Sequence, residues 1–407
     1  MSGARMLLFA HLIAGVDLLP LFIHVLGLAV FAQGTSEFML SGLAPDIARA
    51  LSVSMGAATS LTSAYAIGMI IGAPVMAALS ARWSRRRALA GFLAAFVVVH
   101  VVGAAATDFW LLFGTRIVAA IVNAGFLAVA MSVAVALAGP AAQARATAVL
   151  LSGVTLSCVV GVPAGAVLGD RSGWRAVFAA VAALCLPALV WVFRAAPAGT
   201  AGRADVSIRQ EARALRSRTV WLTLVLAAVV NGATFATFAY LAVIATDVTH
   251  LPGGAVPGLL AVFGAGAFAG VTLAGRRAGG GQLGRGVTLA LCALATGWAV
   301  LAASSAHAVP LFAVTIVQGG LSFGIGSALA AHVMRLAARA PSLSGSFATV
   351  ALNVGAFLGP LLAGGATGVT GDYRGAAWVS AALAATAVAL LAAVRTRAAL
   401  GRAREAR

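Results

Sequence analysis

Glu37 is the residue of this sequence whose position points most directly to chemistry. It is the only one of the ten acidic residues that falls inside a long apolar segment. A charged side chain at the centre of a bilayer costs about 2.5–3.5 kcal/mol on insertion scales, so an acid there faces a cavity or a partner and often carries a proton. We therefore predict that Glu37 takes up and releases a proton. A structural acid held in a salt bridge is the alternative interpretation.

Arg116 is the only arginine inside such a segment, and it matches Glu37 in depth. Glu37 lies six positions before the end of the segment Leu19 to Leu43, and Arg116 lies six positions after the start of the segment Trp110 to Leu137; both of these ends are predicted to lie on the outer side of the membrane. At about 1.5 Å per helical residue, both lie about 9 Å below the membrane boundary. We expect an ion pair or a water-bridged contact that tunes the protonation of Glu37, if the two helices are neighbours. Alternatively, Arg116 extends to the surface or binds a backbone carbonyl.

Further polar side chains within the apolar segments could line a cavity for a neutral substrate. Hydrogen bonds between helices would explain each of them equally well. The candidates are Gln33, Thr35, Ser36, Tyr65, Asn123, Asn231, Thr234, Tyr240, Gln318, Ser322 and Asn353. His24 and His100 show no metal-binding spacing, and we expect both to make structural hydrogen bonds.

Other kinds of chemistry find no support in the sequence. Nothing resembles a catalytic triad, and the three cysteines show no disulfide or metal-ligand spacing. All 27 basic residues are arginine, and the absence of lysine excludes a Walker-type phosphate loop. We therefore expect neither an enzyme nor a bound cofactor or metal.

Composition identifies the elements that must position these residues. Of the 407 residues, 62% are apolar and 9% are charged, whereas soluble domains have about 45–50% apolar and about 25% charged residues. A soluble fold is therefore excluded. At about 20 residues per crossing, the apolar residues supply about 12 membrane-spanning helices. The net charge of +17 is interpreted as a sign of membrane topology and not of nucleic-acid binding.

Twelve apolar segments are bounded by charged residues, Gly or Pro. They are Leu19 to Leu43, Ala57 to Leu79, Ala88 to Ala106, Trp110 to Leu137, Thr147 to Leu168, Ala176 to Phe193, Val220 to Ala245, Val256 to Leu273, Val287 to Ala303, Val309 to Val333, Phe347 to Gly365 and Ala376 to Val394. With the N-terminus inside, 22 of the 27 arginines lie on one side. This bias predicts a multi-pass protein of the plasma membrane with both termini in the cytoplasm.

An internal repeat divides the chain into two halves. A shift of 198 residues places Gly68 on Gly266 and Arg87 on Arg285. Parallel repeats are typical of secondary transporters, whose substrate site lies between the halves. The predicted domains are an N-terminal extension (1–18), a six-helix bundle (19–193), a cytoplasmic linker (194–218), a second six-helix bundle (219–394) and a basic cytoplasmic tail (395–407).

Glycine and proline recur in the fifth and eleventh segments. Gly161, Pro163 and Gly165 lie in the fifth segment, and Gly359 and Pro360 lie in the eleventh. Small residues let helices approach closely, and proline bends a helix by removing a backbone hydrogen bond. We expect these two helices to move against their neighbours.

Several motifs resemble the major facilitator superfamily, in particular its twelve-span drug:proton antiporters. The segment 77–87 is similar to the basic loop of that superfamily, and Arg116 matches the arginine of its fourth-helix motif. The loop arginines are Arg82, Arg85, Arg86 and Arg87, while Ala77, Ala81 and Ser84 replace Gly, Asp and Gly. In the antiporter motif of the fifth helix, Val162 replaces the glycine before the proline. The resemblance implies an all-α fold of two six-helix bundles with pseudo-twofold symmetry, gated by the basic loop.

A narrower resemblance is to the chloramphenicol-resistance exporters of actinobacteria. It rests on segments 31–39, 63–68, 123–126 and 173–175. It implies a monomeric exporter of a small amphipathic drug, with chloramphenicol as the first candidate, driven by the proton gradient through Glu37 and Arg116. The same motifs resemble sugar-efflux and purine-efflux carriers, so a carrier for sugars or nucleosides is the alternative. A membrane sensor without transport is a third.

Overall fold

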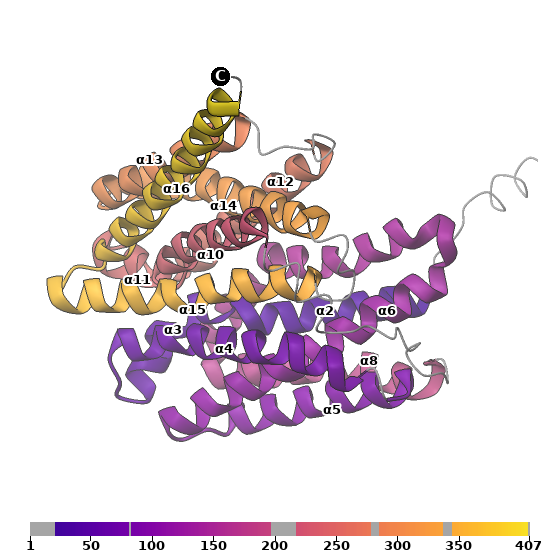
Figure 1. Ribbon diagram of the computed structural model, residues 1–407. Helices are drawn as coiled ribbons and strands as arrows, with labels where there is room; N and C mark the ends of the chain where they lie inside the picture. The colour runs from indigo at the N-terminus through magenta and orange to yellow at the C-terminus, as the bar shows by residue number, and fades with distance from the viewer. Residues whose placement is uncertain (1–20, 81–82, 197–216, 278–284, 337–343, 406–407) are drawn as a thin grey trace, which may run out of the picture.

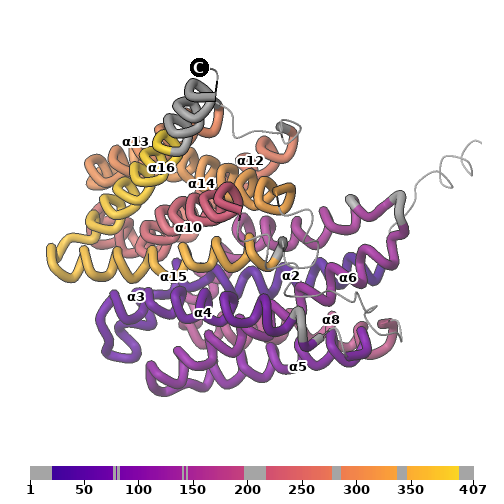
Figure 2. Tube along the Cα trace, in the orientation of Figure 1, coloured from indigo at the N-terminus to yellow at the C-terminus, as the bar shows by residue number. Residues whose placement is uncertain are grey.

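The computed structural model describes residues 21–80, 83–196, 217–277, 285–336 and 344–405 (Figures 1 and 2). Every regular element in these ranges is helical. Twelve helical stretches are long and apolar enough to cross a membrane, which confirms the predicted number of spans. The predicted extension and most of the predicted linker lie outside the described residues, and so does Arg82.

Each half of the chain contributes six of these spans. The helices of the first half are α2 (Leu21–Phe38), α3 (Leu40–Ala50), α4 (Met55–Ser80), α5 (Arg85–Ala104), α6 (Phe109–Leu156), η1 (Ser157–Gly161), α7 (Val162–Ser172) and α8 (Trp174–Ala195). Those of the second half are α10 (Arg218–Phe238), α11 (Leu241–Val243), η3 (Ile244–Val248), η4 (Gly253–Ala255), α12 (Val256–Arg277), α13 (Arg285–Ser304), α14 (Ala308–Leu336), α15 (Ser344–Thr370) and α16 (Gly375–Glu405). The last helix continues into the stretch predicted to be a tail.

The first predicted span is interrupted next to Glu37. α2 ends at Phe38, and α3 begins two residues later. The Ser41 hydroxyl donates to the Phe38 carbonyl oxygen at 2.9 Å, and the Gly42 amide donates to the Met39 oxygen at 3.1 Å. A side-chain hydroxyl that donates to a backbone oxygen in this way competes with the backbone hydrogen bonds of the helix. Glu37 therefore lies in the last turn of α2.

A sharp kink inside α6 separates the fourth span from the fifth. Gly139 has φ 68° and ψ 171° at this point. Glycine adopts positive φ without a steric penalty, and a residue that precedes a proline favours extended ψ. The sequence Gly139-Pro140 therefore explains why the chain turns back here.

The two halves form two bundles, each with its own hydrophobic core. In Figure 1 the first half, coloured indigo to magenta, lies below the second half, coloured rose to yellow. The halves meet where α4 packs against α15 and where α12 packs against η1 and α7. The predicted all-α fold of two six-helix bundles is confirmed.

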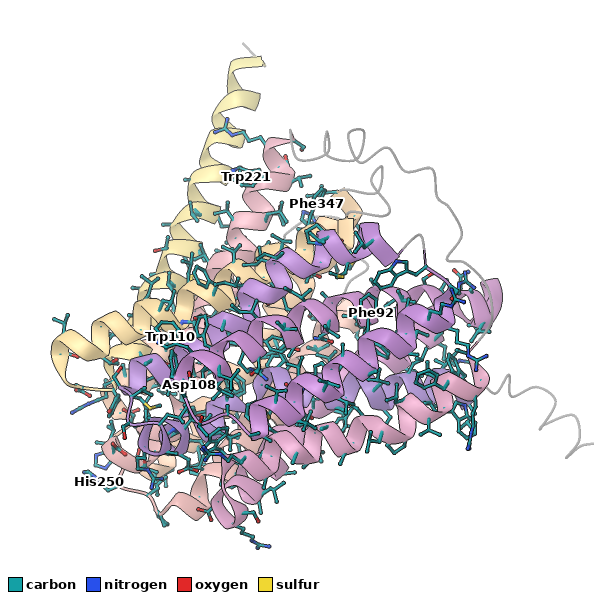
Figure 3. All side chains as sticks on the ribbon, turned by 90° about the horizontal axis from the view of Figure 1, so that it is seen from below. Phe92, Asp108, Trp110, Trp221, His250 and Phe347 are labelled. Atoms are coloured by element: carbon teal, nitrogen blue, oxygen red, sulfur yellow. The ribbon has the colours of Figure 1, made fainter. Side chains whose placement is uncertain are left out.

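The two ends of the bundles differ in charge. One end, called the aspartate end here, carries Asp46, Asp108, Asp170, Asp247 and Asp372. Figure 3 shows Asp108 at this end, together with His250. The opposite end, called the arginine end, carries Arg85, Arg86, Arg87, Arg145 and Arg335.

Candidate functional site

Glu37 and Gln33 lie one turn apart on α2, so they share one face of the helix. Gln33 is only 1% exposed, whereas Glu37 is half-buried. Among the described residues, neither the nitrogen nor the oxygen of the Gln33 amide has a hydrogen-bond partner, and no ion pair includes Glu37. Because buried polar groups are normally hydrogen-bonded, this face is a place where another species can bind.

Arg116 lies next to Glu37 but does not bind its carboxylate. The arginine is 1% exposed. Its Nη1 donates to Ser36 Oγ at 2.8 Å and its Nη2 to the Ser36 carbonyl oxygen at 2.6 Å. α2 and α6 are neighbours, as the predicted contact required. A direct ion pair is nevertheless absent among the described residues, because Arg116 is held by the residue that precedes Glu37.

Ser36 also contacts His100, which lies on α5. Ser36 Oγ is 2.6 Å from His100 Nε2, and His100 Nδ1 is 2.8 Å from the Phe96 carbonyl oxygen. The guanidinium of Arg116 lies 4.6 Å from the ring centre of Tyr65, which adds a cation–π contact. His100 thus makes the hydrogen bonds that the sequence predicted. His24 lies exposed on α2 and makes no hydrogen bond among the described residues, so the prediction for it was wrong.

The remaining polar candidates fall into four groups. Tyr65 and Asn123 contact each other, because Asn123 Nδ2 donates to Tyr65 Oη at 2.9 Å. Tyr240 lies at the interface between the halves and accepts a hydrogen bond of 3.0 Å from Thr59 Oγ1. The others bond to backbone oxygens within their own half: Thr35 to Phe31, Asn231 to Leu352, Thr234 to Val230, Gln318 to Leu294 and Asn353 to Thr349. The buried Ser322 hydroxyl has no partner among the described residues. In the first half, the structure therefore places Gln33, Thr35, Ser36, Tyr65 and Asn123 on the same helices as Glu37 and Arg116 or on the neighbouring α4.

The fifth span changes its helical type beside Glu37. Residues 157–161 form the π-helix η1, directly before the turn that contains Pro163. A side chain at Gly161 would collide with Thr35 of α2, and one at Gly165 would press on Val177. The glycine positions thus allow close packing, and π-helical turns are frequent at functional sites. Gly359, which precedes Pro360, allows the same close approach between α15 and α10.

The basic loop begins α5 at the arginine end. Ser84 caps this helix, because its hydroxyl accepts from the Arg87 amide. Arg86 donates to the carbonyl oxygen of Phe193 at the end of α8. Helix α5 of the first half therefore begins with Arg85, Arg86 and Arg87. The hydrogen bond from Arg86 to Phe193 joins two helices of this same half. Ser84 replaces the family's glycine with a residue that stabilises a helix N-terminus.

Phe38 was not predicted to be important, yet it crosses to the other half. Its ring centre lies 6.0 Å from Phe235, 6.4 Å from Phe238 and 6.3 Å from Phe323. These phenylalanines belong to α10 and α14, so the residue after Glu37 inserts into the core of the second half. No spacing in the sequence distinguishes Phe38 from the other 18 of the 19 phenylalanines.

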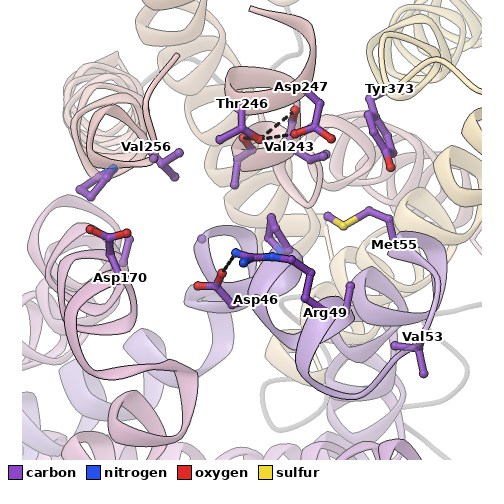
Figure 4. A pocket seen from close by; sticks show the side chains of 17 residues that line it. Asp46, Arg49, Val53, Met55, Asp170, Val243, Thr246, Asp247, Val256 and Tyr373 are labelled. Carbon is purple, nitrogen blue, oxygen red and sulfur yellow. Dashed lines mark hydrogen bonds and ion pairs between the residues drawn. The ribbon is translucent and has the colours of Figure 1, made fainter. Parts of the chain in front are cut away.

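A cavity of about 530 Å³ lies between the halves at the aspartate end (Figure 4). The first half contributes Asp46, Arg49 and Asp170 to it, and the second half contributes Asp247 and Tyr373. Burial raises the pKa of Asp46, Arg49 opposes this shift, and Asp170 adds to it. Burial, and secondly Asp247, raises the pKa of Tyr373. Since both halves line the cavity, its shape depends on how the halves are placed.

Comparisons with known proteins agree with the fold and the motifs. A model of the Major Facilitator Superfamily matches residues 26–351. A chloramphenicol resistance protein of Streptomyces lividans is 48% identical over 91% of this chain and 95% of its own length. The inner membrane transport protein YdhP of Escherichia coli strain K12 is 34% identical over 84% of this chain and 87% of its own length.

Solved structures support the fold. A bacterial homologue of the human lysosomal transporter Spinster, in an inward-facing and occupied conformation, matches with a TM-score of 0.73 at 17% identity, over 92% of this chain and 96% of its own. Together with the sequence matches, this means that the chain belongs to the major facilitator superfamily and is a multi-pass membrane transporter.

Proposed function

We propose that this transporter exports a small amphipathic drug such as chloramphenicol in exchange for protons. The proposal is carried by Glu37, an acid inside a span that has no ion-pair partner among the described residues and lies beside the buried Arg116. The relative from Streptomyces lividans, 48% identical to this chain, is a chloramphenicol resistance protein. That likeness is the reason for naming the drug.

In the proposed cycle, the arginine end faces the cytoplasm, and so do both termini. Glu37 takes a proton when it is accessible from the aspartate end, and drug leaves. The halves then rock, Glu37 releases the proton to the cytoplasm, and drug binds again. Arg116 favours the ionised form of Glu37, because an opposite charge stabilises a carboxylate. The transporter works as a monomer and uses the proton gradient instead of a cofactor.

One proton per cycle supplies enough energy for drug resistance. With a neutral drug, each cycle moves one positive charge inward. A membrane potential of 100 mV then contributes about 2.3 kcal/mol and one pH unit about 1.4 kcal/mol. Together they sustain a drug gradient of about several hundredfold.

Proton release from acidified inverted membrane vesicles tests the proposal. Adding chloramphenicol outside vesicles that contain the wild-type protein is expected to raise the internal pH, because drug enters as protons leave. Vesicles without the protein are the control. If only sugars or nucleosides cause proton release, the protein transports that class of solute and not the drug. If labelled drug is transported but no solute causes proton release, drug transport is not coupled to protons.

Replacing Gln33 by leucine is expected to weaken drug binding. The buried Gln33 amide lies one turn from Glu37 and has no hydrogen-bond partner in the described part of the chain. Losing one hydrogen bond to the drug costs about 1.4 kcal/mol, so KM should rise about tenfold. Transport rates at graded drug concentrations measure this change. Gln143→Leu makes the same substitution at an exposed position and should leave KM unchanged. An unaltered KM in Gln33→Leu would show that the amide does not contact drug.

A further inference from the structure

A directed chain of hydrogen bonds runs from Arg116 through Ser36 to His100. Its direction follows from the chemistry of its two ends. The Phe96 carbonyl oxygen can only accept, so the hydrogen of the 2.8 Å contact must lie on His100 Nδ1. The guanidinium of Arg116 can only donate, so Ser36 Oγ accepts from Arg116 Nη1 at 2.8 Å.

The hydrogen of the Ser36 hydroxyl then points to His100 Nε2, 2.6 Å away. A doubly protonated His100 would reverse this last bond and leave the buried hydroxyl without an acceptor. It would also place a second buried cation one hydroxyl away from Arg116. His100 and Arg116 are each 1% exposed, and Ser36 is fully buried, so water does not offset that cost. The contacts therefore fit only a neutral His100 that carries its hydrogen on Nδ1.

We propose that His100 is a positioning residue for proton coupling: it orients the Ser36 hydroxyl, which in turn holds Arg116 beside Glu37 instead of on its carboxylate. This inference rests on the proposed exchange of protons for drug. Ser36 binds both terminal nitrogens of Arg116, through Oγ and through its backbone oxygen, and Nε of Arg116 has no partner among the residues that the structure describes. The placement of the charge thus depends on Ser36, and the placement of its Oγ depends on His100.

The ionisable groups around these hydrogen bonds lie on six helices. They are Glu37 on α2, Tyr65 on α4, His100 on α5, Arg116 on α6, Cys158 on η1 and Cys185 on α8. Glu37 is the only carboxylic acid among them. A guanidinium released from Ser36 Oγ therefore has the Glu37 carboxylate as its nearest acidic partner, and a direct ion pair would stabilise the ionised acid.

Two substitutions of His100 separate positioning from packing. In His100→Leu, Ser36 loses its acceptor and its hydroxyl turns to the backbone of its own helix, as serine does inside helices. Arg116 then pairs with Glu37, so half-maximal drug-driven proton exchange is expected at a pH lower by about one unit. In His100→Gln, the amide oxygen lies the same number of bonds from Cα as Nε2, and the pH profile should return to that of the wild type. Equal pH midpoints for His100→Leu and the wild type, at equal amounts in the membrane, would overturn the proposal.

A nuclear magnetic resonance measurement tests the same inference without transport. The chain has six histidines, so the signals of His100 in isotope-labelled protein in nanodiscs are identified by their loss in His100→Gln. At neutral pH we expect a protonated Nδ1 and an unprotonated Nε2. A hydrogen on Nε2 would overturn the proposal even if exchange proceeds as expected. Wild-type protein that shows the expected tautomer but no drug-driven proton release would instead refute the proposed function.

Discussion

Replacing Glu37 by glutamine is expected to abolish drug-driven proton release while leaving the protein folded in the membrane. Glutamine keeps the shape of the side chain and replaces one carboxyl oxygen with an NH2 donor, but it cannot be ionised. Asp170 is the other acid within a described span, but it lies near the aspartate end and lines the cavity there, so no other carboxyl group of the described spans can replace Glu37 at its depth. The rate should fall to about a hundredth or less, as when a proton-transferring side chain is removed from an enzyme. Proton release from acidified inverted vesicles measures it.

The matched control for this variant is Glu405→Gln, which makes the same change near the end of α16. It should release protons at the wild-type rate. A second measurement uses exchange of labelled for unlabelled drug at equal concentration, which requires no net proton movement. Glu37→Gln should retain this exchange, because the halves can still rock with drug bound. Proton release that persists in Glu37→Gln would place the coupling group elsewhere.

The large elements of the fold could be predicted because a bilayer restricts what a chain can do. A helix satisfies its backbone hydrogen bonds within one segment, as the lipid interior requires, so the number of long apolar segments predicted twelve spans, and twelve are found among the described residues. The breaks within spans could not be predicted in this way. The break after Phe38 coincides with a single hydrogen bond, from the Ser41 hydroxyl to the Phe38 oxygen. The hydropathy of the sequence does not predict such a bond.

The candidate site was predictable to the level of helices and depth. We could assign Glu37 and Arg116 to the site because they are charged residues within apolar segments. The structure places them on neighbouring helices. The partner of Arg116 did not follow, because depth cannot distinguish the Glu37 carboxylate from the adjacent Ser36. The insertion of Phe38 into the second half was also beyond reach, because it depends on how the two bundles dock. Pairwise contacts between halves require the tertiary structure.

A disulfide between residues 56 and 364 is expected to lock the aspartate end and stop transport. A Cβ atom at Gly56 on α4 would lie 3.8 Å from the Gly364 Cα, and a Cβ at Gly364 on α15 would lie 3.6 Å from the Gly56 Cα. Disulfides need Cβ atoms about 3.5–4.5 Å apart, so the two side chains point toward each other at a suitable distance. The Thr59–Tyr240 hydrogen bond shows that the halves are joined at this same end.

Transport requires this end to open if drug leaves through it, because alternating access is largely a rocking of one bundle against the other. Gly56→Cys combined with Gly364→Cys should therefore lose about nine-tenths or more of its drug transport on oxidation and regain it on reduction. Cys292, which is exposed, is replaced by alanine beforehand, while Cys158 and Cys185 are buried. Each single cysteine variant is the control and should be indifferent to the oxidant. If protein that is shown to be cross-linked still transports drug at the full rate, α4 and α15 need not separate at the aspartate end. Drug would then leave by another path.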